Sequence, residues 1–347
     1  MNKIILDKTE VSEKSPCYVI AEVGHNHQGN IESCKKLFLE AKLSGANAVK
    51  LQKRNNKKLY TEKFYNSPYD NPNSYGKTYG LHREFLEFNK SQYLELKKYA
   101  KEIDITFFAT PFDFDSVDFL EEINLPFYKI ASADITNLPL INYVIERKKP
   151  IIFSTGGCTE KDIKRTYDLL KKSKSEFALL HCVSSYPTPP ELVNLELISY
   201  YRNKFNCIVG FSSHDNGIAL SLASYVKGAR IIEKHFTLDR SLKGTDHPMS
   251  LAPSGLRKLV KDLKKIEKAT GNGRKTLLDK EKEPIKKMAK KIVASKSLKK
   301  GTIIQLSNLD FKSPGDGLPP YMAYDLVGKK LTKDIEFEHS FTLSDFS

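Results

Sequence analysis

The stretches Ile208-Val-Gly-Phe-Ser-Ser-His214 and Arg230-Ile-Ile-Glu-Lys-His-Phe-Thr237 decide the fold class of this chain. Each is short and apolar, which is typical of a buried β-strand, and residues 219–227 between them have the pattern of a helix. A strand–helix–strand unit predicts two parallel neighbouring strands. His214 and His235 would then lie at one rim, where two neutral imidazoles indicate a divalent metal site. The alternative is that each histidine only caps its strand or hydrogen-bonds locally.

The same unit recurs along the chain, and its repetition predicts an α/β fold of the (β/α)8, or TIM, barrel type. A doubly wound open sheet is the alternative, but no GxGxxG follows the first predicted strand. The predicted strands are residues 18–24, 48–53, 105–111, 127–132, 151–156, 177–183, 208–214 and 231–237.

Two segments interrupt this rhythm. Residues 54–89 are predicted to form a long loop rich in Asn, Tyr, Lys and Pro, whose aromatic residues favour an ordered lid over the site. Residues 271–284 are polar and contain glycine, and short β-type runs with turn signals follow them. We therefore predict a barrel domain at 1–273, a linker at 274–288 and a small β-rich domain at 289–347.

The composition, with 40% hydrophobic and 28% charged residues, is that of a globular enzyme. No apolar run is long enough to span a bilayer and no secretion signal is evident, so we expect a cytoplasmic protein without a membrane partner. The five cysteines form no close pair, as is expected of reduced thiols. The net charge of +14 comes mostly from lysines spread over predicted helix faces, so we expect no nucleic-acid partner.

Polar side chains gather at the carboxyl ends of the predicted strands, where such barrels place their active sites. Lys50 and Lys129 interrupt apolar strands, and a buried lysine is costly unless it meets an anion. Either lysine could instead be a surface or edge residue. Together with nearby hydroxyl groups they predict a pocket for phosphate and carboxylate. The other predicted rim residues are Glu22, Gln52, Thr110, Ser132, Ser154, Ser184, Ser212, His214, Glu233 and His235.

A metal ion at the histidines would lie beside this anion pocket. A Lewis acid acting on a carbonyl group, next to a phosphate-bearing nucleophile, indicates carbon–carbon bond formation or a lyase reaction.

Short motifs along the predicted barrel also carry a resemblance to a known family. They are Ile20-Ala-Glu-Val-Gly-His-Asn-His-Gln-Gly29, Val49-Lys-Leu-Gln-Lys53, Ala109-Thr-Pro-Phe112, Tyr128-Lys-Ile-Ala-Ser132, Ser154-Thr-Gly156, Ser185-Tyr-Pro-Thr-Pro189, Gly210-Phe-Ser-Ser-His214 and Glu233-Lys-His-Phe-Thr237. In this order they resemble the sialic acid synthase family. The tail from about Ala289 is similar to the antifreeze-like, or SAF, domain of that family, so the resemblance covers nearly the whole chain.

The resemblance implies an N-acetylneuraminate synthase, which condenses phosphoenolpyruvate with N-acetylmannosamine and water to give sialic acid and phosphate. His214 and His235 would hold Mn2+, Mg2+ or another divalent cation that polarises the aldehyde of the open-chain sugar. Carbon 3 of phosphoenolpyruvate attacks this aldehyde, water adds to carbon 2, and C–O cleavage releases phosphate. The resemblance also implies a homodimer with swapped C-terminal domains.

Roles for individual residues follow from the same resemblance. It implies that Glu22, Tyr186 and Asp246 act with the two histidines in catalysis. The implied substrate-binding residues are Lys50, Gln52, Thr110, Phe112, Lys129, Ser132, Asp134, Ser154, Ser184, Ser212 and Glu233. Tyr186 could instead be a packed loop aromatic, and Asp134 and Asp246 could be helix caps.

The chain departs from the family pattern at three positions. Asp134 stands where bacterial members often have Glu, and Ser184 stands where some have Asn. Ser313 replaces an arginine that in many bacterial members contacts the sugar in the partner's site, so that contact is lost or another residue supplies it.

Residues 74–80 are closer to animal-type synthases, some of which use a 6-phosphorylated sugar. A synthase of N-acetylneuraminate 9-phosphate, of legionaminic or pseudaminic acid, or of a spore-coat sugar therefore stays an alternative. A catalytically inactive barrel that binds a ligand is a further alternative.

Overall fold

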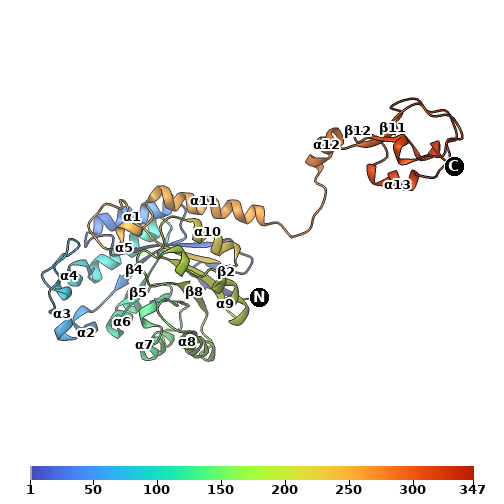
Figure 1. The fold of residues 1–347 in the computed structure, drawn as a ribbon. Coiled ribbons are helices and arrows are strands. Elements are labelled where there is room, and N and C mark those ends of the chain that lie inside the picture. The colour runs from blue at the N-terminus through green and yellow to red at the C-terminus, as the bar shows by residue number, and fades with distance from the viewer. Residues whose placement is uncertain (1) are drawn as a thin grey trace. The chain divides into compact units, whose positions relative to one another are not determined.

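The computed structural model describes residues 2–347, which divide into two compact units, residues 2–270 and Gly271–Ser347 (Figure 1). The first unit is the predicted α/β barrel, and the second is a small domain with short strands. Within the described residues, no helix is long and apolar enough to cross a membrane.

Eight parallel strands close into a barrel in the order β10-β3-β4-β5-β6-β7-β8-β9. Each predicted strand is confirmed, with its ends shifted by at most two residues. The bounds are β3 Tyr18–Gly24, β4 Ala48–Lys53, β5 Thr106–Pro111, β6 Tyr128–Ile130, β7 Ile151–Ser154, β8 Phe177–Cys182, β9 Ile208–Ser213 and β10 Ile231–His235.

A helix follows each strand and packs its apolar face on the outside of the barrel. Side-chain caps define where several of these helices begin: Asn30 accepts a hydrogen bond from the backbone of Ser33, and Asp113 accepts one from the backbone of Ser116. The helices are α1 Ile31–Leu43, α5 Lys90–Glu102, α6 Phe114–Ile123, α7 Leu138–Ile145, α8 Glu160–Lys172, α9 Glu196–Lys204, α10 Ala219–Val226 and α11 Pro253–Thr270.

The barrel interior has two layers with different chemistry, because alternate residues of each strand point inward. The lower layer is a fully apolar cluster that includes Ile20, Phe108 and Ile152. Two residues further along the same strands, the inward positions are the buried polar residues Glu22, Thr110 and Ser154. The polar residues of the predicted site therefore stand on a rigid apolar floor.

An N-terminal hairpin that the sequence patterns did not predict belongs to this floor. Strands β1 (Lys3–Leu6) and β2 (Thr9–Ser12) are antiparallel, and Ile4, Leu6 and Val11 share one buried cluster with the interior residues of the barrel. The hairpin therefore plugs the end of the barrel opposite the predicted site.

The segment 54–89 is not the single long loop that its composition predicted. It contains α2 (Asn56–Leu59), α3 (Glu62–Tyr65) and α4 (Tyr79–Leu86). Thr61 and Thr78 cap the last two of these helices with their hydroxyl groups. Its aromatic rings pack on one another, as in the stacked pair Tyr75 and Phe85 at 4.9 Å between centroids. The segment is thus an ordered lid, held together by its own side chains.

The second unit has its own buried core, which includes Ile292, Leu326 and Phe341. Its elements are α12 Asp279–Met288, β11 Lys291–Ala294, β12 Leu309–Lys312 and α13 Ala323–Leu326, with β11 and β12 antiparallel. Helix α12 lies inside the segment 274–288 that we predicted to be a linker. The Glu281 side chain accepts a hydrogen bond from the backbone of Leu278 and so starts this helix.

The plug makes a prediction about stability. Ile4 is completely buried, so Ile4→Ala should lower the free energy of unfolding by about 2–5 kcal/mol. Ile5 is the matched control, because it is the next residue of the same strand and is 42% exposed; Ile5→Ala should change the free energy by less than about 1 kcal/mol. Urea denaturation of both variants measures this difference, and equal effects would contradict the packing of the hairpin into the barrel.

Candidate active site

A cavity of about 730 Å³ lies at the carboxyl ends of the barrel strands. The predicted site residues that line it are Glu22, Lys50, Gln52, Thr110, Phe112, Lys129, Ser132, Ser154, Ser184, Tyr186, Ser212, His214, Glu233, His235 and Asp246. Asp134 is the exception and does not line the cavity.

Strand register explains why residues distant in sequence meet here. Glu22 on β3 is paired with Lys50 on β4 on one side and with His235 on β10 on the other. Likewise Glu233 on β10 is paired with Ser212 on β9. Paired positions on neighbouring parallel strands direct their side chains to the same face, so these inward side chains lie next to one another inside the barrel.

Four buried charged side chains form the centre of this site. The ammonium group of Lys50 lies 3.1 Å from Glu22 Oε2 and 3.5 Å from Glu233 Oε2. Lys129 lies 3.4 Å from Glu233 Oε1, to which Ser212 also donates a hydrogen bond of 2.9 Å. Two lysines and two glutamates thus balance one another in charge.

Burial and mutual attraction set the protonation of this cluster. Burial by itself raises the pKa of Glu233, but Lys129 and Lys50 outweigh it and lower the pKa to about 2. Burial lowers the pKa of Lys50, yet the two glutamates raise it above its ordinary value. Burial dominates at Lys129, whose pKa is lowered. Glu233 is therefore a carboxylate throughout the physiological pH range.

Hydroxyl groups line the cavity next to the lysines. Ser132 Oγ accepts a 2.9 Å hydrogen bond from the backbone N–H of Gly156, while the buried Ser154 Oγ has no partner among the described residues. A Cβ atom on Gly156 would lie 2.3 Å from Ser184 Oγ and would push this hydroxyl aside. The backbone thereby brings three serines together as donors for an oxyanion.

His214 and His235 come together as predicted, with 5.5 Å between their ring centroids. His214 Nδ1 lies 2.8 Å from the carbonyl oxygen of Val183, a contact that makes Nδ1 the donor and leaves Nε2 free as a ligand. Burial, and then the neighbouring His235, lower the pKa of His214 to about 3, so this ring is neutral. His235 Nδ1 is buried without a hydrogen-bond partner in the described chain, 3.6 Å from Asp246 Oδ2.

These donors fit a divalent cation that takes few ligands from the protein. No group of three or more His, Cys, Asp or Glu side chains that could hold a metal ion occurs within residues 2–347. An ion held by the two imidazoles would therefore take its remaining ligands from substrate and water oxygen atoms. Imidazole nitrogens are ordinary ligands of divalent transition metals, whereas Mg2+ prefers oxygen ligands.

The remaining predicted residues differ in their surroundings. Tyr186 is 56% exposed, and its ring lies 4.1 Å from that of His214. Asp246 makes no side-chain cap, whereas the Oδ1 atom of Asp134 accepts a hydrogen bond of 3.3 Å from Asn137. A contact between Asp134 and a substrate thus stays a prediction.

Several cavity residues were not predicted from the sequence. They are Arg54, Asn73, Arg83, Ala131, Ala133, Cys182 and Thr245. Arg54 could have been found, because it continues the alternation of Lys50 and Gln52 by a further two residues. Asn73 and Arg83 come from the lid, where no local periodicity points to a cavity.

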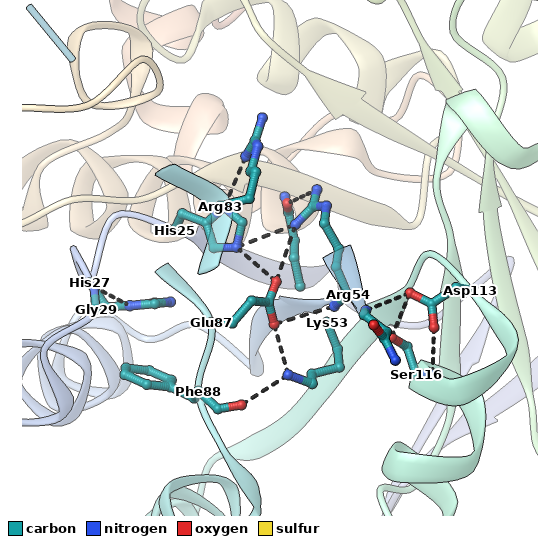
Figure 2. A network of polar contacts seen from close by, with 12 residues as sticks. His25, His27, Gly29, Lys53, Arg54, Arg83, Glu87, Phe88, Asp113 and Ser116 are labelled. Atoms are coloured by element: carbon teal, nitrogen blue, oxygen red, sulfur yellow. Dashed lines mark hydrogen bonds and ion pairs between the residues drawn. The ribbon is translucent and has the colours of Figure 1, made fainter. Parts of the chain in front are cut away.

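Figure 2 shows how the lid is joined to the barrel by a polar network around Glu87. Glu87 Oε2 lies 2.8 Å from Lys53 Nζ, and Oε1 lies 3.7 Å from His25 Nε2. Arg54 stacks on the ring of Phe112 at 3.8 Å. The lid residue Glu87 thereby holds the end of β4 and the loop after β3 in place.

Comparisons with known proteins agree with this geometry. A model described as the NeuB family matches residues 37–275, and one described as a SAF domain matches residues 291–345. The N-acetylneuraminate-9-phosphate synthase of Homo sapiens is 39% identical over 328 residues, which cover 94% of this chain and 91% of the human protein. An N,N'-diacetyllegionaminic acid synthase of Campylobacter jejuni is 38% identical over 320 residues, which cover 91% of this chain and 96% of the Campylobacter protein.

A solved structure gives the same result. The N-acetylneuraminic acid synthetase of Leptospira borgpetersenii, in complex with citrate, is 34% identical with a TM-score of 0.72. The match covers 82% of this chain and 95% of the Leptospira chain.

The charge cluster makes a prediction that needs no substrate. Glu233→Gln removes the carboxylate that lies between two buried ammonium groups, and should lower the free energy of unfolding by about 3–5 kcal/mol. Asp168→Asn is the control, since it breaks an exposed pair with Lys164 worth less than about 1 kcal/mol. Denaturant unfolding compares the two variants. A Glu233→Gln protein as stable as the control would show that the cluster does not stabilise the barrel.

Proposed function

Because this chain belongs to the NeuB family, we propose that it condenses phosphoenolpyruvate with an N-acetylmannosamine-type sugar and water to give an N-acetylneuraminate-type sialic acid and phosphate. The synthases of this family join phosphoenolpyruvate to a sugar, so the chain is a transferase that forms a carbon–carbon bond. The observation that carries the proposal is the single cavity with a lysine and hydroxyl pocket on one side and a histidine pair on the other.

Phosphoenolpyruvate fits the side of the cavity formed by Lys50, Lys129 and the serines. Both ammonium groups are buried, so their attraction for phosphate and carboxylate oxygens is little screened by water. The hydroxyl of Ser154 has no hydrogen-bond partner in the described chain, so it can donate to an anion without breaking an existing hydrogen bond. The substrate would replace Glu22 and Glu233 as the partner of the lysines.

That replacement would leave two carboxylates next to the reacting carbons. Glu22 Oε1 accepts a 2.8 Å hydrogen bond from Gln52 Nε2, which fixes the orientation of its carboxylate. We assign Glu22 to the water chemistry: its carboxylate accepts a proton from the water that adds to carbon 2 of phosphoenolpyruvate.

His214 and His235 would hold the divalent cation on which synthases of this family generally depend. When bound, the cation supplies a Lewis acid for the aldehyde oxygen of the sugar. The chain itself orients the pair: the carbonyl group of Val183 fixes the ring of His214, and Tyr186 packs against this ring.

The sugar would lie between the histidines and the lid. Gln52, Tyr186 and Asp246 line this part of the cavity and offer amide, hydroxyl and carboxylate groups to its hydroxyl groups. Ser313 is too short to replace the sugar contact of an arginine. Its hydroxyl instead donates a hydrogen bond to the carbonyl oxygen of Met288 and accepts one from Lys290. A swapped homodimer and a cytoplasmic location complete the proposal.

An assay of phosphate release tests the activity. The protein is incubated with phosphoenolpyruvate, Mn2+ and one of three sugars: N-acetylmannosamine, its 6-phosphate, or a 2,4-diacetamido-trideoxy hexose. We expect turnover with N-acetylmannosamine or its 6-phosphate, and little turnover without a sugar. Mass spectrometry identifies the nine-carbon keto acid product. Turnover with the diacetamido sugar alone would assign the chain to the legionaminic or pseudaminic acid synthases, and no turnover with any sugar would refute the proposal.

Metal removal tests the histidine pair. Dialysis against a chelator should abolish turnover, and Mn2+ should restore it. In calorimetry, His235→Ala should weaken Mn2+ binding by more than about 100-fold, because it removes one of two protein ligands. His339→Ala is the control, since His339 lies in the other unit, paired with Asp345. Unchanged Mn2+ affinity in a folded His235→Ala protein would contradict the assignment.

A further inference from the structure

A further buried ion pair, Lys234 with Asp215, has no part in the reaction outlined above. Lys234 is 1% exposed and Asp215 is 3% exposed, and the ammonium group lies 3.0 Å from Asp215 Oδ1. Neither residue lines the cavity, and no other ion pair of the described chain involves either of them. Each is a sequence neighbour of one histidine of the site, since Asp215 follows His214 and Lys234 precedes His235. These two residues are called the β9–β10 ion pair below.

The ammonium group of Lys234 contacts the chain on both sides of His214. It donates to the carbonyl oxygen of Asp215 at 2.6 Å as well as to the carboxylate, and it lies 3.3 Å from Ser213 Oγ. The hydroxyl of Ser213 in turn donates to Asp215 Oδ1. One side chain of β10 thus holds the end of β9 at the two positions that flank a proposed metal ligand.

The strand pairing of β9 with β10 stops short of the two histidines. Its last pair is Ser213 with Lys234, one residue before His214 on one strand and before His235 on the other. The histidines therefore lie just beyond the point where the strand register sets the distance between the two chains.

Beyond that point the two chains bond to different neighbours. The carbonyl oxygen of His214 accepts a hydrogen bond of 3.1 Å from the backbone of Thr188, and that of His235 accepts one of 2.8 Å from the backbone of Leu251. The β9–β10 ion pair joins the chains where the pairing ends.

The two rings are not held equally. His214 Nδ1 lies 2.8 Å from the carbonyl oxygen of Val183, whereas His235 Nδ1 has no hydrogen-bond partner in the described chain. The direction of the His235 ring therefore depends on where the end of β10 lies. A metal ion needs its ligands at a fixed separation, and groups that orient the ligands influence its affinity.

The position of Lys234 on its strand also argues for a role other than stability. Ile232 and Phe236 point to the same side of β10 and are fully buried, so this side of the strand suits an apolar residue. A buried ion pair is often no more stabilising than apolar residues in its place. What the pair adds is hydrogen bonds of defined direction between two strand ends.

We propose that Lys234 and Asp215 are positioning residues of the metal site, whose ion pair sets the separation and relative orientation of His214 and His235. The inference rests on the proposed function, in which the two histidines hold the divalent cation. It extends the determinants of metal affinity from the cavity to the outer side of the barrel wall.

Calorimetric titration with Mn2+, without substrates, tests this role. Lys234→Met should weaken Mn2+ binding by about 10–100-fold, the usual effect of losing a group that orients a metal ligand. Lys234→Arg keeps the charge and the donors and should recover part of the affinity. Lys149→Met is the matched control and should leave the affinity unchanged, since Lys149 forms a 2.8 Å ion pair with Glu121 and neither residue lines the cavity.

A double variant separates positioning from stability. Lys234→Met combined with Asp215→Asn leaves no unpaired buried charge, and the amide oxygen can still accept from Ser213, so the protein should fold as the wild type does. It should bind Mn2+ as weakly as Lys234→Met alone. Binding of phosphoenolpyruvate without metal, measured in the same way, should be unchanged, because the lysines of its proposed pocket stand on β4 and β6.

The outcomes distinguish this inference from the proposed metal site. Wild-type Mn2+ affinity in the folded double variant, with loss of affinity in His235→Ala, would keep the site and overturn the positioning role. An equal loss of Mn2+ and phosphoenolpyruvate binding in the double variant would also overturn it, since the defect would then be a general one. Unchanged Mn2+ affinity in both variants would refute the histidine site and this inference together.

Discussion

The buried pairing of Lys50 and Lys129 with Glu22 and Glu233 is the interaction on which the functional end of the barrel depends. Each charge alone would be costly to bury, and together they are stable only if four strands hold them within reach of one another. The closed parallel barrel provides this, since its register sets Glu22 beside Lys50 and Glu233 beside Ser212. In the proposed function, the same pairing keeps a place for an anion, because each lysine would exchange a carboxylate of the chain for one of a substrate.

Much of this arrangement follows from short-range patterns in the sequence. An apolar run that ends in a lysine or histidine predicts both a strand and a polar side chain at the rim of the barrel. The strand pattern alone therefore predicts that His214 and His235 lie close together. Residues spaced by two along a strand share a side, so Lys50 also predicts Gln52. The family resemblance added Tyr186 and Asp246, whose loops carry no such periodicity.

The features that the sequence did not reveal depend on contacts between distant segments. The N-terminal hairpin has only three buried apolar side chains, and their partners lie in the barrel strands. Arg83 reaches the cavity because Glu87 and the aromatic residues of the lid pack that segment over the strand ends. Composition predicts a lid in residues 54–89, but not which of its side chains point inward.

The hairpin plug also shapes how the molecule exchanges material with solvent. Ile4, Leu6 and Val11 pack against the apolar floor and close that end of the barrel, so the cavity opens only at the lid end. Substrates must enter and products must leave past the same lid. The floor and the lid share no residue. Substitutions in the lid can therefore alter which molecules enter the cavity while the barrel keeps its structure. A fold divided in this way allows related proteins to diverge in their choice of sugar at little cost in stability.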